Sequence, residues 1–259
     1  MPIVTVLEKL YGSGIPENFV KLYSRLVTGL KVQLRFVGTT DRGWIQLDVS
    51  GDDKTVALNL LDRETGLAPA SLERMKKFSV LKGKIVSSDK SADELYVDLG
   101  ASKVLNASVS AGRLQAQLAD GKEVPLQKLV ELFCLYDNLP IEVKITADVE
   151  AGTEAVEALL SDVQLSLFKR WIRQRFDRLI ILGALFSDVE RVVKLSRHSR
   201  DIINTESVGV LEQVVLCKLG TDAVGLIPKL GRYLKKSAVL VPFSPKKIVK
   251  TLGSQHFDW

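Results

Sequence analysis

The last third of the chain follows an order of strands and helices that few folds accept. An apolar run at 176–184 is typical of a strand buried on both faces. It is followed by an amphipathic helix at 187–203, whose valines form one apolar stripe. A hairpin is then predicted over 204–219, a second helix over 221–236 and a last strand over 237–243. The predicted order is therefore β-α-β-β-α-β.

The N-terminal end predicts a similar order. Residues 3–11 form an expected strand, 14–30 an expected helix with one apolar side, and 31–49 a hairpin that alternates apolar and polar residues. A second helix is predicted over 54–63, and a fourth strand is not visible. Both ends match the order of ferredoxin-like domains, so the expected fold class is α+β.

The middle of the chain is rich in strands. Strand-like segments lie at 80–88, 94–100, 103–109, 112–118 and 140–148. Short strands at this spacing suit a five- or six-stranded barrel. A helix capped by Ser161 then leads from this region into the C-terminal one.

Five segments of this middle region carry a resemblance to a known domain. They are Gly83 to Val86, Leu95 to Gly100, Val124 to Leu129, Ile141 to Ile145 and Val156 to Asp162. In this order they resemble the first and second strands, the segment after the third strand, and the fourth and fifth strands of an S1 domain, an RNA-binding variety of the OB barrel. The chain is longer than the S1 pattern between Gly100 and Val124, so we expect an inserted hairpin there that could cover the binding face.

The S1 resemblance implies a role for Tyr96. Its strand neighbours face the expected core, so Tyr96 faces outward. An outward aromatic at this place stacks on bases in S1 domains, and a stacked base contributes roughly 1–3 kcal/mol. Lys82, Lys84 and Lys103 are close enough in the sequence to bind phosphates. The alternative is a tyrosine that packs against a neighbouring domain or the inserted hairpin, and both interpretations stay open.

Residues 211–222 and 225–227 carry a second resemblance. With the three-part layout, they are similar to an uncharacterised family of archaeal proteins, a domain of unknown function. This resemblance implies an archaeal, cytosolic protein and no particular activity. The expected organisation is a ferredoxin-like domain at 1–75, an S1-like barrel at 76–160, a connecting helix at 161–176, a basic ferredoxin-like domain at 177–250 and a tail at 251–259.

Charge is divided unevenly along the chain. Between residues 169 and 250 there are 17 Lys and Arg against 7 Asp and Glu, a balance of +10, whereas the whole chain, with 36 against 31, carries +5. Several basic clusters in one small domain suit a large structured polyanion such as ribosomal RNA. The expected RNA-binding cations are Arg170, Arg173, Arg175, Arg191, Lys194, Arg197, Lys229, Arg232, Lys235 and Lys236. The alternative is a solvated surface without a ligand.

Two other motifs have plain structural interpretations. Arg42-Gly43-Trp44 is similar to the start of an RNA-recognition motif, but Gln46 stands where that motif has an aromatic, so we expect Trp44 to be a packing residue. The segment 220–231 is similar to a ligand loop of ACT domains, in which the amides of Thr221 to Ala223 would hold an anion. An ordinary capped helix start is favoured there.

Signatures of enzymes, metal sites and membrane spans are not found in the sequence. There is no glycine-rich phosphate loop, HExxH or GxSxG, and the two cysteines, Cys134 and Cys217, lie far apart. We therefore expect two buried thiols and no cofactor. The two separated cysteines favour a reduced, cytoplasmic chain. No apolar run approaches the roughly 20 residues of a membrane helix.

These patterns favour a non-catalytic RNA-binding protein that acts on the translation apparatus, at the ribosome, or on the transcription apparatus. Its main partner would be RNA, with proteins of the ribosome or of RNA polymerase as further partners. Two alternatives stay open. One is a protein-interaction scaffold without RNA binding, and the other is an ACT-like small-molecule sensor.

Overall fold

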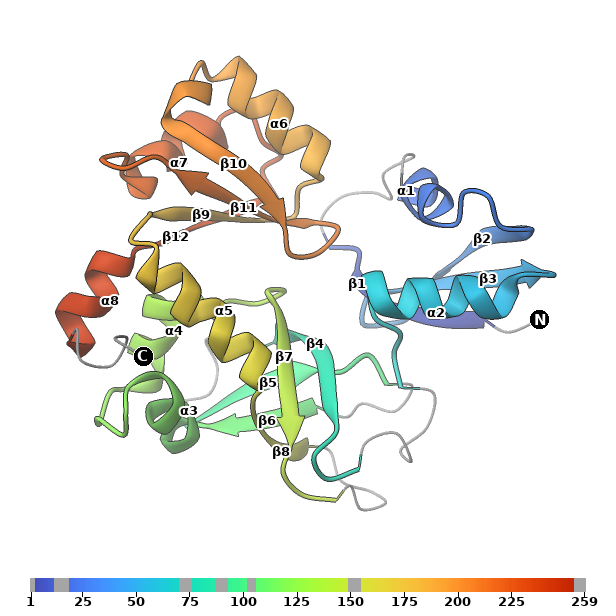
Figure 1. The fold of residues 1–259 in the computed structure, drawn as a ribbon, viewed down its shortest axis with the longest axis horizontal. Helices are drawn as coiled ribbons and strands as arrows, with labels where there is room; N and C mark the ends of the chain where they lie inside the picture. The colour runs from blue at the N-terminus through green and yellow to red at the C-terminus, as the bar shows by residue number, and fades with distance from the viewer. Residues whose placement is uncertain are drawn as a thin grey trace.

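The computed structural model describes residues 3–11, 19–69, 76–86, 93–101, 106–148 and 155–253, without the side chains of 19–22. It is a mixed α+β structure with one closed barrel and two further sheets. Figure 1 shows the N-terminal unit in blue, the barrel in green and the C-terminal unit in yellow to red. Lys103 and the aromatic end of the tail lie outside the described residues.

The N-terminal unit is a three-stranded antiparallel sheet with two helices. In chain order its elements are β1 (Ile3–Lys9), α1 (Phe19–Leu26), β2 (Val32–Thr39), β3 (Trp44–Gly51) and α2 (Lys54–Glu64). The sheet order is β1-β3-β2. Alternate residues of β3, among them Leu47 and Val49, are buried against Leu61 of α2 and its neighbours. In place of a fourth strand, one isolated bridge joins Val6 to Leu67.

The middle of the chain closes into a five-stranded barrel. Its elements are β4 (Val80–Val86), β5 (Glu94–Asp98), β6 (Asn106–Ser110), α3 (Ala111–Leu118), α4 (Leu126–Phe133), β7 (Pro140–Ile145) and β8 (Ala155–Leu160). The strand order is β4-β5-β6-β8-β7, and only the β6–β8 pair is parallel. Gly83 permits the close approach of β5, because a Cβ there would lie 2.5 Å from the carbonyl oxygen of Asp98.

The expected strand at 112–118, and with it the expected inserted hairpin, is wrong: this segment is helix α3 (Figure 1). Ser110 begins the helix, because its hydroxyl accepts a hydrogen bond from the amide of Arg113. Leu114 and Leu118 are buried in the barrel core. Two leucines four residues apart fit both the period of a strand and that of a helix, so the apolar pattern alone does not separate the two.

The C-terminal unit has the β-α-β-β-α-β order predicted from the sequence, flanked by one helix on either side. Its elements are α5 (Asp162–Arg173), β9 (Arg178–Leu182), α6 (Phe186–Leu195), η2 (Ser199–Asp201), β10 (Ile202–Ser207), β11 (Glu212–Cys217), α7 (Ala223–Gly231), β12 (Val239–Phe243) and α8 (Pro245–Leu252). The sheet order is β10-β11-β9-β12, and all neighbours are antiparallel. Ser161 caps α5 as expected.

Both faces of the central strands β9 and β11 of this C-terminal sheet are buried, whereas the edge strand β10 is mostly exposed. Leu179 and Ile181 of β9 pack against α6 and α7, whereas Ile180 and Leu182 belong to the core shared with the barrel. Helices α5 and α8 cover the second face, where the rings of Trp171 and Phe243 pack edge to face with their centres 5.2 Å apart. Because this core is continuous, the barrel and the C-terminal unit form one body. The N-terminal unit has a core of its own.

Candidate functional site

The predicted C-terminal cations are all exposed, and the fold divides them between two surfaces. The α6–α7 surface lies on one side of the sheet and carries Arg191, Lys194, Arg197, Lys229, Arg232, Lys235 and Lys236. The α5–α8 surface lies on the other side and carries Arg170, Arg173 and Arg175, together with Lys246, Lys247 and Lys250 of α8. The sheet separates the two surfaces, so a single basic patch does not form.

Cations from both helices meet on the α6–α7 surface. A hydrogen bond with His198 lowers the pKa of Asp201, and the charges of Arg200 and Lys229 lower it further, so these groups lie close together. At the other end of the surface, Arg191 and Lys235 line one hollow. Arg191 is bonded to Asp188 at 3.2 Å on the exposed surface, where such a pair adds little stability.

The start of α7 does not resemble an empty anion site. The carboxylate of Asp222 accepts a hydrogen bond from the amide of Val224 at 3.0 Å and caps the helix. An acidic side chain therefore lies where the ACT-like interpretation needs a bound anion near Thr221 to Ala223.

The barrel face with Tyr96 is only partly open. Tyr96 is half-buried, and its hydroxyl donates to Glu94 at 2.7 Å. Lys82 is exposed. The expectation that Lys84 binds phosphate is wrong, because Lys84 is only 1% exposed. The N- and C-terminal units cover this part of the barrel surface.

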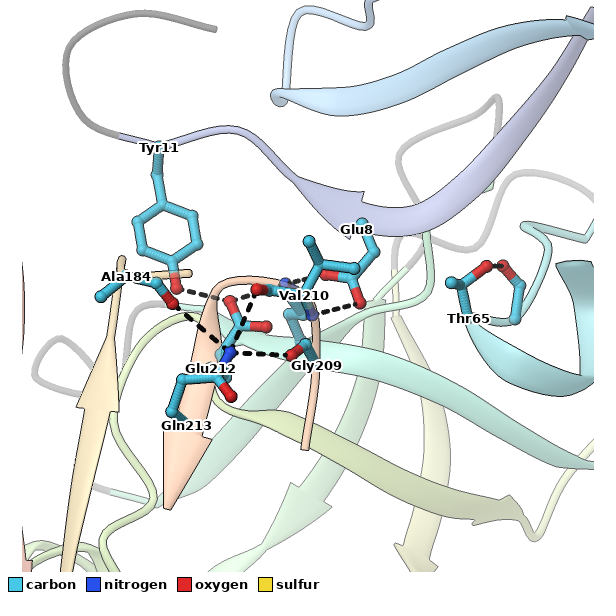
Figure 2. A network of polar contacts seen from close by, with 10 residues as sticks. Glu8, Tyr11, Thr65, Ala184, Gly209, Val210, Glu212 and Gln213 are labelled. Carbon is cyan, nitrogen blue, oxygen red and sulfur yellow. Dashed lines mark hydrogen bonds and ion pairs between the residues drawn. The ribbon is translucent and has the colours of Figure 1, made fainter. Parts of the chain in front are cut away.

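Lys84 joins all three units. Its ammonium group, on β4 of the barrel, lies 2.9 Å from Glu8 of β1 and 2.8 Å from Glu212 of β11. Figure 2 shows Tyr11 beside Glu212 and Val210 beside Glu8, the two carboxylates that contact Lys84. The Tyr11 hydroxyl donates to Glu212, and the Val210 amide donates to Glu8 at 2.9 Å. We name Glu8, Tyr11, Lys84 and Glu212 the three-unit junction.

A second buried carboxylate lies beside the junction. Asp98 of β5 accepts hydrogen bonds from Lys9 at 2.8 Å, from the Trp44 indole at 2.9 Å and from the Gly100 amide at 2.9 Å, and it also pairs with Arg42. Trp44 is fully buried, so the prediction that it is a packing residue is confirmed. This site fixes the N-terminal unit on the outer surface of the barrel.

Sequence reasoning missed these buried charges. Glu8 and Lys9 interrupt the apolar strand at 3–11, and Glu212 with Gln213 stands inside the apolar run at 211–219. Charged residues are rarely fully buried unless they are paired. A charged residue inside an otherwise apolar strand could therefore have indicated a buried ion pair.

Burial and charge act against each other within the junction. Burial favours the neutral form of Lys84, but the charges of Glu212 and Glu8 outweigh it and raise the pKa of Lys84. Burial also raises the pKa of Glu212, to about 7, although Lys84 opposes this shift. Among the described residues, the Oε2 atom of Glu212 has no hydrogen-bond partner. A proton on Glu212 therefore lowers the cost of burying two carboxylates beside one ammonium group.

The raised pKa of Glu212 predicts a pH dependence of stability. Between about pH 4.5 and pH 7 the folded state keeps a proton on Glu212 that the unfolded state has lost, so this group's contribution to stability falls as the pH rises. The Glu212→Gln variant, which cannot titrate, is expected to lack this contribution, on the order of 1–3 kcal/mol. Urea unfolding at pH 5, 6, 7 and 8 measures the difference. If the free energy of unfolding changed with pH in the same way for variant and wild type, the raised pKa of Glu212 would be contradicted.

Metal ligands and reactive thiols are two further features to consider in the described part of the chain. No group of three or more His, Cys, Asp and Glu residues able to hold a metal ion occurs there. Cys134 and Cys217 are free and buried, as predicted, and burial raises the pKa of both thiols to about 12. Within the same residues, no helix combines the length and the apolar character that crossing a membrane requires.

Comparison with known families identifies both ends of the chain. Residues 3–70 match the DUF2110 N-terminal domain, and residues 176–241 match the DUF2110 C-terminal domain. No curated protein matches the chain. The two matched segments coincide with the N-terminal unit and most of the C-terminal unit, and the barrel lies between them. The archaeal origin implied by the sequence resemblance stays a prediction. The chain belongs to the DUF2110 family.

Proposed function

We propose that the protein binds structured RNA, without catalysing a reaction, through the exposed cations of its C-terminal unit. The observation that carries this proposal is that all ten predicted cations of this unit are exposed, on a body whose core is continuous with the barrel. A rigid body with cations on two sides offers a fixed array of charges to phosphates, which favours structured RNA over a small anion.

The finer fold assignments support this proposal. We infer an S1-like OB barrel from the closed five-stranded order and the helices inserted between its third and fourth strands. We infer a ferredoxin-like C-terminal unit because its first strand, β9, lies between its third and fourth strands, β11 and β12. The N-terminal unit is then a ferredoxin-like unit whose fourth strand is reduced to one bridge.

Binding to a structured RNA is expected to depend steeply on salt. Neutralisation of about five phosphates gives a log–log slope of roughly −3 to −5. A variant with Lys194, Lys229 and Lys236 replaced by Gln should bind more weakly and reduce the slope by about 2. Fluorescence titration at several salt concentrations measures both quantities.

The matched control neutralises three exposed cations of the N-terminal unit, Lys31, Arg35 and Lys54, to Gln. This control variant should have nearly the same affinity for RNA and nearly the same salt slope as the wild type. Absence of RNA binding by the wild type at low salt would overturn the proposal.

A cytoplasmic role at the ribosome or RNA polymerase is tested by sedimentation of lysate with and without ribonuclease. A single protein partner that nuclease leaves bound would favour the scaffold alternative instead.

A further inference from the structure

Phe78, which lies just before the first barrel strand β4 in the chain, is an exposed aromatic residue on a constrained backbone. Its φ angle is 72°, in the left-handed region that bulky residues rarely occupy. Its amide donates to the carbonyl of Ile145 at 2.8 Å, and the amide of Ser79 donates to the carbonyl of Lys76 at 2.9 Å, so the backbone is fixed on both sides. The residue is nevertheless 64% exposed. Burial of the ring therefore does not compensate for the unfavourable backbone conformation.

Lysines surround this ring. The ammonium group of Lys77 lies 5.3 Å from the ring centre, and that of Lys144, on the adjacent strand β7, lies 5.8 Å from it. Alternate residues of a strand share one face, so Val80 and Lys82 of β4 both face outward. Val80 pairs with Lys144, whose ammonium group lies over the Phe78 ring. Val80 is 51% exposed, and Lys82 is exposed.

Few acidic groups among the described residues oppose these cations. Asp148 accepts a hydrogen bond from the Lys77 amide at 3.1 Å, and Glu142, opposite Lys82, accepts one from Ser161 at 2.6 Å. With Lys76, which is also exposed, four lysines stand against these two carboxylates in the part of the chain that the structure describes. We name Lys76, Lys77, Phe78, Lys82 and Lys144 the Phe78 patch.

We propose that the Phe78 patch binds single-stranded RNA, with one base stacked on the Phe78 ring and the flanking phosphates held by Lys77 and Lys144. The combination of an exposed ring with neighbouring cations suits a single nucleic-acid strand, in which flat bases alternate with charged phosphates. A protein partner would favour a broader apolar surface, and among the described residues Val80 is the exposed apolar side chain that the strand places near the ring. The inference rests on the proposed RNA-binding function and names a second, separate contact for it.

This patch differs from the contact expected at Tyr96. Tyr96 pairs with Val86 at the far end of β4, and its hydroxyl is bonded to an acidic side chain. Phe78 precedes the near end of β4 and is surrounded by lysines. The charges therefore favour Phe78 over Tyr96 as the stacking residue of the barrel.

The test uses a fluorescently labelled single-stranded oligoribonucleotide and the full chain. Phe78→Gly is expected to weaken binding about 5- to 100-fold with an unchanged salt slope, since it removes stacking and no charge. Glycine accepts the positive φ angle, so this variant should fold at least as well as the wild type. Phe78→Trp should retain binding. The double variant Lys77→Gln with Lys144→Gln should reduce the slope by about 1 to 2.

The control Val56→Ala removes apolar surface from the N-terminal unit, where Val56 is 54% exposed, and should leave binding unchanged. An abasic strand of equal length should bind wild type and Phe78→Gly equally. If structured RNA binds as proposed but Phe78→Gly binds the single strand normally, this inference is overturned while the proposed function stands. If neither RNA binds, both are overturned. The inference would also be overturned by a protein partner that stays bound after nuclease treatment but does not bind the Phe78→Gly variant. The patch would then be a contact for a protein.

Discussion

Replacement of Lys84 by methionine is expected to lower the free energy of unfolding by about 3–5 kcal/mol. Methionine keeps most of the buried volume but removes the ammonium group that lies 2.9 Å from Glu8 and 2.8 Å from Glu212. The variant therefore buries two carboxylates without a cation between them. Urea unfolding at pH 8 measures the loss.

The control for this prediction is Lys82→Met, two residues away on the same strand. Lys82 is exposed, so its replacement should change the free energy of unfolding by less than about 0.5 kcal/mol. The cost of Lys84→Met should also be smaller at pH 6 than at pH 8, because a proton on Glu212 removes one of the two charges. An equal, small cost at both pH values would mean that neither carboxylate is charged in the folded state.

The order of the elements could be predicted because it depends on local periodicity. The alternating residues of β3 and the two-sided apolar run of β9 are visible in the sequence, and the structure places them as strands. Helix α2 was predicted within one residue at its end. The barrel strands β4, β5 and β7 could be found in the same way, since each has its inward residues at alternate positions.

The location of the buried charges could not be predicted, because it depends on contacts between units. Alternation along β4 places Lys84 on the outer face of the barrel, which is correct. No local pattern shows that Glu8, 76 residues earlier, and Glu212, 128 residues later, cover that face. A lysine that strand periodicity assigns to solvent is thus a central residue of the interior.

The same dependence on contacts between units applies to the candidate RNA surface. The sequence showed that residues 169–250 are basic, and the fold then divided those cations between the α6–α7 and α5–α8 surfaces. The fold also buried both faces of the central strands β9 and β11, and the exposed cations of this unit lie on its helices and loops. Phe78 was not singled out, because an exposed ring cannot be distinguished from a core ring by residue type alone.

Replacement of Asp98 by alanine is the second change with a large expected effect. Asp98 accepts hydrogen bonds from Lys9, Trp44 and Gly100 and pairs with Arg42, so its loss leaves two cations and an indole N–H without their shared acceptor. Burial already lowers the pKa of Lys9, and Asp98 opposes that shift. We expect a loss of about 3–4 kcal/mol in urea unfolding.

Two controls separate the charge of Asp98 from its general packing. Asp98→Asn keeps an acceptor oxygen and should cost less than alanine, whereas Asp41→Ala, on the exposed turn beside Arg42, should cost less than about 0.5 kcal/mol. Hydrogen exchange then shows where the loss acts. Because the N-terminal unit has its own core and meets the barrel through polar contacts, its attachment should weaken first, with faster exchange near Trp44. Uniformly faster exchange in all three units would instead mean that the Asp98 site is part of a single cooperative core.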